Sequence, residues 1–240
     1  MLRVNWNYIK LIVLFGVMVF LFAFASNRNA TRRVTEIDIN FIGENNLFVT
    51  YETVSKLLIQ NQASVKNVPK ETLDLNQLEK SLNSNLMIKS AEVYVTVNGV
   101  VKADIEQKTP IARVSTSESY YIDDEGFYMP LSKNYTARVP LVTGYVNKNN
   151  LKSVFSVAEK IRSDAFLTKN VFEIYQDSKE VLYLKLRQCN FDVKLGSEEN
   201  LDKKINNLKA FYKKNLKDKT LNNYSKINLQ FDNQVVCTKT

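Results

Sequence analysis

Histidine is absent from this 240-residue chain. Its absence excludes Ser-His-Asp and Cys-His nucleophile systems, and it also excludes metal sites built on imidazole ligands. The two cysteines, Cys189 and Cys237, lie too far apart to match a zinc-binding spacing. We interpret them as buried or half-buried thiols. A disulfide between them requires an oxidising compartment, and the sequence leaves that alternative open.

The short motifs by which many enzymes bind phosphate or metal are also missing. The chain contains no GxxxxGK(S/T), no GxGxxG, no HExxH and no CxxC. One acidic cluster, Asp123-Asp124-Glu125, could supply a general acid–base pair or a cation site, or it could be a polar turn between strands. We favour the turn. We therefore predict no catalytic residue, no cofactor and no metal, and keep an enzyme acting through this cluster as an alternative.

The charge balance is basic, with 33 Lys and Arg against 25 Asp and Glu and a net charge of +8. Such an excess is compatible with nucleic acid or an anionic surface as a partner. The basic residues are spread along the chain, however, and form no run or recognisable motif. We predict that the protein binds no nucleic acid.

An uninterrupted apolar run extends from Leu11 to Ala25. If it starts at Tyr8 and Lys10 snorkels, it holds about 18 residues and reaches about 27 Å, close to the ~30 Å hydrocarbon core of a bilayer. A signal peptide has a similar apolar segment, and Ala23-Phe24-Ala25 resembles a cleavage site. The bulky phenylalanines around that triplet and the aromatic start of the run favour an uncleaved anchor.

The flanking charges do not by themselves give the orientation of this anchor. Arg3 and Lys10 precede it, whereas Arg28, Arg32 and Arg33 follow it, so counting alone places the short tail outside. A tail of about ten residues is too short for a function of its own, and a large following domain can translocate whatever its flanking charges. We predict residues 1–10 as a cytoplasmic tail and 11–27 as a transmembrane helix.

Residues 34–108 show the order strand, helix, helix, strand, strand, which predicts a small α+β domain. Ile37, Ile39 and Phe41 alternate with polar residues, as expected of a half-buried strand. Thr50 and Asp74 precede the two helical segments as N-caps. Asn98-Gly99 indicates a hairpin, in which we expect Val97 to face Val101 and Val95 to face Ala103.

Residues 109–240 predict a mixed β-sheet domain with two helices, capped by Asn150 and Ser197. Its strands are expected at Ile111–Val114, Tyr120–Asp123, Phe127–Leu131, Val171–Tyr175, Val181–Arg187, Asn190–Leu195, Ile227–Phe231 and Gln234–Thr238. The last strand contains no proline or glycine and ends the sequence. An exposed edge at that position would invite another chain to add a strand, whereas an interior strand would simply close the sheet. The sequence leaves both readings open.

These features together resemble the FtsQ/DivIB family of bacterial division proteins. The resemblance rests on the short tail, the single apolar span and the strand–helix–helix–strand–strand order that ends in the segment from Gln107 to Val114. It also rests on three later motifs, Tyr121–Gly126, Pro140–Gly144 and Ile227–Asn233. It covers nearly the whole chain. One position departs from the family pattern, which has a small residue where this chain has Gln234.

The resemblance implies a POTRA domain at 34–108 and the family's β domain at 109–240. It implies a non-enzymatic divisome scaffold in the bacterial inner membrane, with its bulk in the periplasm and a place at the division septum. Its partners would be FtsB-like and FtsL-like bitopic proteins, with a link to the septal peptidoglycan synthase complex. The partner-binding positions would be Phe231, Asp232, Asn233, Gln234, Val235, Val236 and Cys237.

Two alternatives stand beside this interpretation. One is a POTRA-bearing component of secretion or outer-membrane assembly. Such proteins usually carry a membrane barrel, but the residues after 109 include helices and lack the repeated ~10-residue dyad pattern of barrel strands. The other is a periplasmic enzyme that uses the acidic cluster.

Overall fold

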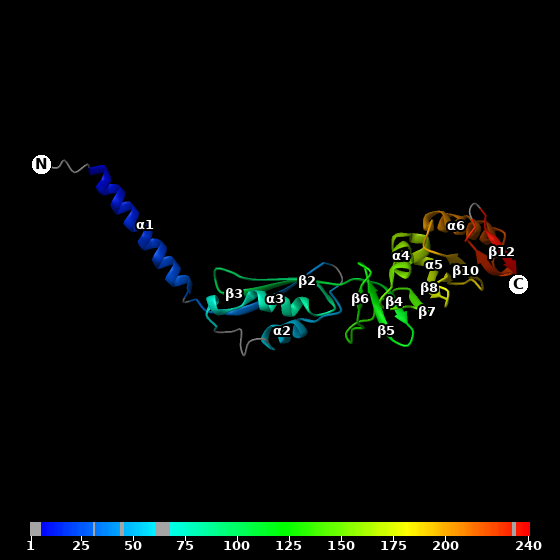
Figure 1. The fold of residues 1–240 in the computed structure, drawn as a ribbon, viewed down its shortest axis with the longest axis horizontal. Coiled ribbons are helices and arrows are strands. Elements are labelled where there is room, and N and C mark those ends of the chain that lie inside the picture. The colour runs from blue at the N-terminus through cyan, green and yellow to red at the C-terminus, as the bar shows by residue number, and fades with distance from the viewer. Residues whose placement is uncertain (1–5, 31, 44–45, 61–67, 232–233) are drawn as a thin grey trace. The chain divides into compact units, whose positions relative to one another are not determined.

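The computed structural model describes residues 6–30, 32–43, 46–60, 68–231 and 234–240 (Figure 1). The chain forms two compact units, Met1–Gln107 and Lys108–Thr240. The first unit contains the N-terminal helix and a three-stranded sheet, and the second contains a nine-stranded sheet. The fold is α+β, as predicted. Residues 1–5 of the predicted tail lie outside the described residues.

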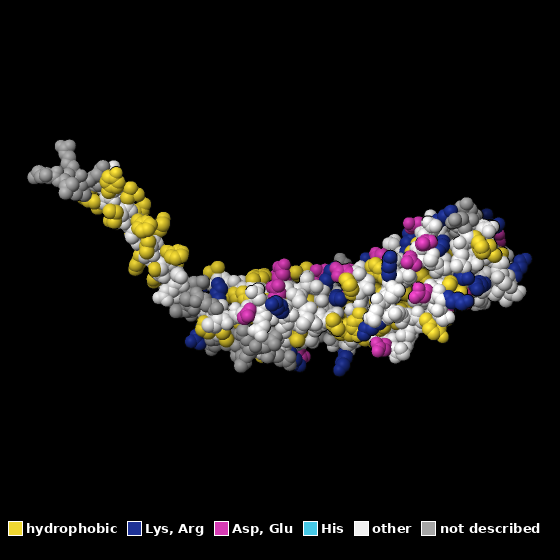
Figure 2. Space-filling view, in the orientation of Figure 1, with side chains coloured by type: hydrophobic (Ala, Val, Ile, Leu, Met, Phe, Trp, Pro, Cys, Tyr) yellow, Lys and Arg dark blue, Asp and Glu magenta, His cyan; other side chains and the backbone are white. Residues whose placement is uncertain are grey.

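The N-terminal helix α1 runs from Trp6 to Ala30, further at each end than the predicted span 11–27. Within it, Trp6–Arg28 is long and apolar enough to cross a membrane, because 23 residues extend about 35 Å along a helix axis. Figure 2 shows apolar side chains along the length of this helix, and large ones such as Phe20 and Phe22 are 68% and 77% exposed. Surfaces of this kind need lipid or another apolar partner to cover them.

The sheet of the first unit has the strand order β1-β3-β2, with β1 (Glu36–Ile42) parallel to β3 (Val100–Gln107) and β2 (Ile88–Val95) antiparallel to it. Between the parallel strands β1 and β3, the chain passes through the helices α2 (Tyr51–Gln60) and α3 (Leu75–Asn83) and then through β2. Both helices cover one face of the sheet. Their buried side chains share a core with those of the strands: Val54, Leu58, Leu78, Leu82, Ile39, Ala91, Val93, Val101, Ala103 and Ile105. The strand–helix–helix–strand–strand order is therefore confirmed.

The β2–β3 hairpin differs from the predicted register by two residues. Val95, not Val97, faces Val101, and Val93 faces Ala103. The turn is longer than expected because Thr96 N–H donates to Val100 O and Gly99 N–H donates back to Thr96 O. Val97 is left 70% exposed at the turn. A shift of two residues keeps each side chain on its original face, so the apolar face of the sheet survives the error.

The sheet of the second unit has the order β12-β11-β10-β9-β8-β7-β4-β5-β6. Three neighbouring pairs are parallel, namely β4–β7, β7–β8 and β10–β11, and the others are antiparallel. The strands are β4 (Pro110–Ser115), β5 (Ser119–Asp123), β6 (Tyr128–Met129), β7 (Leu141–Gly144), β8 (Val171–Gln176), β9 (Leu182–Leu186), β10 (Asp192–Gly196), β11 (Tyr224–Asn228) and β12 (Val236–Lys239). The mixed sheet is confirmed, and β7 is a strand that the sequence did not predict.

Parallel neighbours need crossover connections. Helices supply two of the three in this unit, whereas β4 is connected to β7 through β5 and β6. The helices α4 (Lys152–Ser163) and α5 (Ala165–Asn170) link β7 to β8, and α6 (Leu201–Lys217) links β10 to β11. They lie on one side of the sheet in Figure 1, and one core joins them to the strands. Two helices were predicted, so α5 is an addition. It begins at Asp164, whose carboxylate accepts the backbone N–H groups of Phe166 and Leu167.

Both predicted caps in this unit are wrong. The helix α4 is preceded by Leu151 rather than Asn150, since Leu151 is 7% exposed and packs into the core. The helix α6 begins after Asn200 rather than Ser197, and Glu198 and Glu199 precede it. Asn200 has φ 53°, a left-handed conformation that asparagine adopts more readily than most residues. That turn delays the start of the helix.

Candidate partner-binding edge

The last strand, β12, forms one edge of the nine-stranded sheet and pairs only with β11 among the described strands. Its register sets Ile227 opposite Cys237 and Asn228 opposite Val236. Of the two alternatives that the sequence left open, the structure therefore has the edge strand. An edge of this kind presents backbone donors and acceptors that another chain can pair with.

The pairing of β11 identifies which backbone groups of β12 point outward. Leu229 N–H donates to Lys194 O, so the alternate residue Ile227 also directs its N–H toward β10. Asn228 and Lys226 then direct theirs toward β12. Because directly opposed residues alternate between hydrogen-bonded and non-hydrogen-bonded pairs, the pair Ile227–Cys237 is non-hydrogen-bonded. The N–H and C=O of Cys237 therefore point away from β11.

The side chains of the edge alternate between the core and the surface. Val235 and Cys237 are half-buried against the core, whereas Val236 is 43% exposed and Thr238 is exposed. Burial raises the pKa of the Cys237 thiol, and both cysteines are free. A half-buried, protonated thiol of this kind contributes packing rather than nucleophilic chemistry.

The seven residues predicted to bind a partner do not all lie on the strand. Val236 and Cys237 belong to β12, and Gln234 and Val235 lead into it. The predicted strand Ile227–Phe231 ends early, because β11 stops at Asn228, and Phe231 lies beyond it with 47% of its surface exposed. Asp232 and Asn233 lie outside the described residues.

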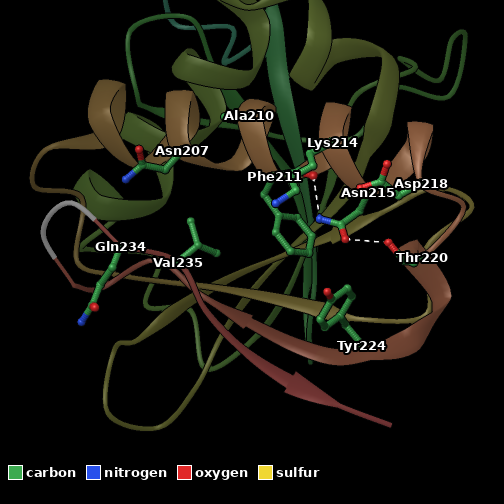
Figure 3. Close-up of a pocket in the computed structure, with 10 residues that line it drawn as sticks. All are labelled: Asn207, Ala210, Phe211, Lys214, Asn215, Asp218, Thr220, Tyr224, Gln234 and Val235. Atoms are coloured by element: carbon green, nitrogen blue, oxygen red, sulfur yellow. Dashed lines mark hydrogen bonds between the residues drawn. The ribbon is translucent and has the colours of Figure 1, made fainter.

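A groove of about 590 Å³ adjoins the edge, between α6 and the segment that enters β12. In Figure 3, Phe211 and Lys214 project from α6, and Val235 and Tyr224 face them from the sheet side. The aromatic wall is continuous, since the rings of Phe211 and Tyr224 meet edge to face with centroids 5.3 Å apart. The groove thus offers an apolar patch at Phe211, Tyr224 and Val235, among polar side chains, near the free backbone groups of β12.

One buried asparagine holds the end of α6 against the start of β11. Asn215 is 7% exposed, donates to Phe211 O at 2.9 Å and accepts the hydroxyl of Thr220 at 2.7 Å (Figure 3). Thr220 N–H also donates to Asn215 O. These bonds satisfy a polar side chain that would be costly to bury alone, and both Asn215 and Thr220 line the groove.

The sequence prediction missed the groove residues Phe211, Lys214 and Tyr224 and the outer strand residues Thr238 and Lys239. Phe211 was assigned to the core face of its helix by spacing, and it does pack there, but its ring also lines the groove. No local sequence pattern identifies such residues, because α6 and the segment that enters β12 come together only in the folded domain. Thr238 already lay in the predicted strand Gln234–Thr238, whereas Lys239 lies beyond it and lysine has a low β propensity, so no local signal indicated it.

The acidic cluster forms the turn that the sequence favoured. Asp123 is 1% exposed and accepts hydrogen bonds from Lys108 Nζ at 2.7 Å, Phe127 N at 2.7 Å and Glu125 N at 3.1 Å. Its carboxylate oxygens are thus engaged within the protein. Among the described residues, no three His, Cys, Asp or Glu side chains group in a way that could hold a metal ion.

Comparison with known families matches both halves of the chain. A model described as "FtsQ/DivIB, C-terminal related" covers residues 109–238, more than half of the chain. The chain belongs to the FtsQ/DivIB family. A second model, described as a POTRA-like domain, covers residues 33–106. The groove and all of β12 except Lys239 therefore lie within the matched segment.

Two curated relatives carry the name cell division protein FtsQ. The protein from Geotalea daltonii is 25% identical over 153 residues, which cover 59% of this chain and 55% of that relative. The protein from Myxococcus fulvus is 24% identical over 112 residues, which cover 46% of this chain and 39% of that relative. The matched part of the chain thus spans about half of these relatives or less.

Proposed function

We propose that this protein is a non-enzymatic scaffold of the bacterial division machinery, and that it captures bitopic partners at the β12 edge. The observation that carries the proposal is an edge strand in the family-defining domain whose Cys237 N–H and C=O point outward. A partner strand added there would gain backbone hydrogen bonds, and alternate side chains would supply specificity. The groove beside Val235 would receive an apolar side chain of the same partner.

The partners we propose are FtsB-like and FtsL-like proteins. Membership of the family and the relatives' names support a role in division. Through these partners the protein would help to regulate septal peptidoglycan synthesis. The positions proposed to bind are Phe231, Asp232, Asn233, Gln234, Val235, Val236 and Cys237.

The proposed location is the inner membrane, crossed once by α1, with the tail in the cytoplasm and the two folded units in the periplasm. The single long apolar helix among the described residues supports this arrangement. A membrane-anchored scaffold needs a binding surface and no catalytic site of its own, which agrees with an acidic turn in which the Asp123 carboxylate is engaged in structural bonds.

Deletion of residues 234–240 tests the binding proposal. We expect the truncated protein to fail to capture the FtsB-like protein of the same genome and to stay folded by circular dichroism, although it should melt at a lower temperature because it loses the β11–β12 pairing. The control changes surface residues elsewhere: the double variant Lys133→Gln with Lys179→Gln alters two exposed loop residues. Capture at the full-chain level by a folded truncation would refute strand addition.

A fluorescent fusion tests the place of action. We expect a band at mid-cell during constriction, and we expect Asp123→Asn and Asp124→Asn variants that still fold to retain it and to support division. A uniform envelope signal would count against the division scaffold. Normal localisation with loss of division in the folded aspartate variants would instead point to chemistry at the acidic turn.

A further inference from the structure

A second pocket in the β domain lies away from the β12 edge. It has a volume of about 430 Å³, within the range of ligand-binding clefts. Its apolar floor comes from Pro110 and Ile111 of β4, Ile161 of α4 and Val171 of β8. In the sheet order, β9, β10 and β11 separate β8 from β12. The pocket and the edge are therefore different surfaces of one domain.

Three arginines from separate segments line this pocket, namely Arg138, Arg162 and Arg187. Arg162 forms an ion pair with Glu159, in which Nε lies 3.0 Å from the carboxylate, and another nitrogen of its guanidinium lies 4.0 Å from the Asp124 carboxylate. Among the residues that the structure describes, the guanidinium groups of Arg138 and Arg187 have no hydrogen-bonding or ion-pair partner. A guanidinium group binds a carboxylate through two parallel hydrogen bonds. Two guanidinium groups without an ion-pair partner, beside an apolar floor, therefore fit a ligand that combines carboxylates with apolar groups.

The segment that carries Arg138 also presents free backbone. It is held at one end by Ala137 N–H, which donates to Tyr121 Oη, and at the other by Pro140 O, which accepts from Arg113 N–H. Between these anchors, the N–H groups of Arg138 and Val139 have no acceptor within the described parts of the chain. A segment that is held at both ends and has free donors is suited to bind a peptide backbone.

We propose that this pocket binds an extended acidic segment of a partner polypeptide, in which carboxylates flank an apolar side chain. Arg138 and Arg187 would receive the carboxylates, the floor at Ile111 and Ile161 would receive the apolar side chain, and one free N–H, that of residue 138 or of residue 139, would bind a peptide carbonyl. The free backbone donors favour a peptide over an anionic lipid, which would use only the guanidinium groups and the floor. The proposal does not depend on binding at β12.

The test uses the full chain in detergent and a fluorescent acetylated, amidated peptide with the sequence Ser-Glu-Ser-Leu-Ser-Glu-Ser, which sets both glutamates and the leucine on one face of an extended chain. Fluorescence anisotropy should show saturable binding that weakens with rising salt, because exposed charge pairs are screened. The double variant Arg138→Gln with Arg187→Gln should lose at least tenfold in affinity. The charge-matched control, Lys133→Gln with Lys179→Gln, should bind as the unchanged chain does.

Two altered peptides separate the contributions. Glutamine in place of each glutamate should weaken binding by at least tenfold, and serine in place of the leucine should weaken it severalfold. Equal affinity for the acidic and glutamine peptides, or for the arginine variant and the control, would overturn the proposal. Deletion of residues 234–240 should leave binding unchanged, and its loss would assign the peptide to the β12 edge instead.

A lipid occupant is the remaining outcome. Short-chain phosphatidylglycerol and inorganic phosphate are titrated as competitors of the bound peptide. Weak competition by both supports the peptide assignment. Arginine-dependent binding of the lipid, together with failure of the acidic peptide to bind, would refute it and identify an anionic-lipid site.

Discussion

Proline scanning of the last strand gives the sharpest test of the proposed edge. Cys237 directs its N–H outward, whereas Thr238 faces Lys226 in a hydrogen-bonded pair and directs its N–H toward β11. Proline removes the N–H at either position, and it is tolerated in a sheet only where that group faces away from a neighbouring strand. The two substitutions should therefore affect different properties.

Cys237→Pro should weaken partner binding and spare the fold. It removes one backbone donor available to an added strand, worth about 0.5–1.5 kcal/mol, and its ring obstructs the approaching backbone. We expect a loss of at least tenfold in affinity, about 1.4 kcal/mol. The thiol is only half-buried, so the change in unfolding free energy should stay within about 1 kcal/mol. Cys237→Val, which keeps the N–H, is the control for the side chain.

Thr238→Pro should destabilise the domain. It removes a ladder hydrogen bond and leaves Lys226 O without its donor, at a cost of about 1–3 kcal/mol. Urea denaturation followed by circular dichroism measures the stability, and anisotropy with the periplasmic segment of the FtsB-like partner measures the affinity. The reasoning fails if folded Cys237→Pro binds as tightly as Cys237→Val. It fails equally if Thr238→Pro is no less stable than Cys237→Pro.

Three further outcomes are expected. Asp123→Asn should lower the unfolding free energy of the second unit by about 3 kcal/mol or more, because it leaves Lys108 without its buried partner; a loss under about 1 kcal/mol in urea would contradict this. Burial raises the pKa of Asp164, but the hydrogen bonds from Lys209 and from the Leu167 N–H outweigh it, so the pKa lies below its ordinary 3.8. The stability that this carboxylate contributes is present above pH 3.8 and is lost as the pH falls through the lowered pKa. Melting temperatures should therefore drop in that acidic range, and they should drop less in Asp164→Asn. Melting temperatures that fall equally with pH in both proteins would argue against the linkage. Mass spectrometry of the native protein should show the residues before Ser26 retained, and a mature terminus at Ser26 would exclude the anchor.

Local patterns predicted most of the elements, because each depends on neighbours within a few residues. Ile37, Ile39 and Phe41 alternate in burial along β1 as their period-2 spacing indicated. Asp74 caps α3 by accepting the N–H of Gln77 at 3.0 Å, as its position in the sequence suggested. Where local signals compete, as with Ser197 and Asn200 before α6, the backbone conformation of the turn determines which residue begins the helix.

The candidate sites required the tertiary structure. The sequence by itself determined the apolar helix, the α+β class, the two-unit organisation and the presence of a final strand, since these depend on composition and periodicity. Only the fold decided that β12 lies at an edge, that Cys237 points its N–H outward, and that Arg138 and Arg187 meet at one pocket 49 positions apart in sequence. The order of the strands, and the approach of residues far apart in sequence, are set by crossover connections and by core packing between distant segments. No local sequence pattern encodes them.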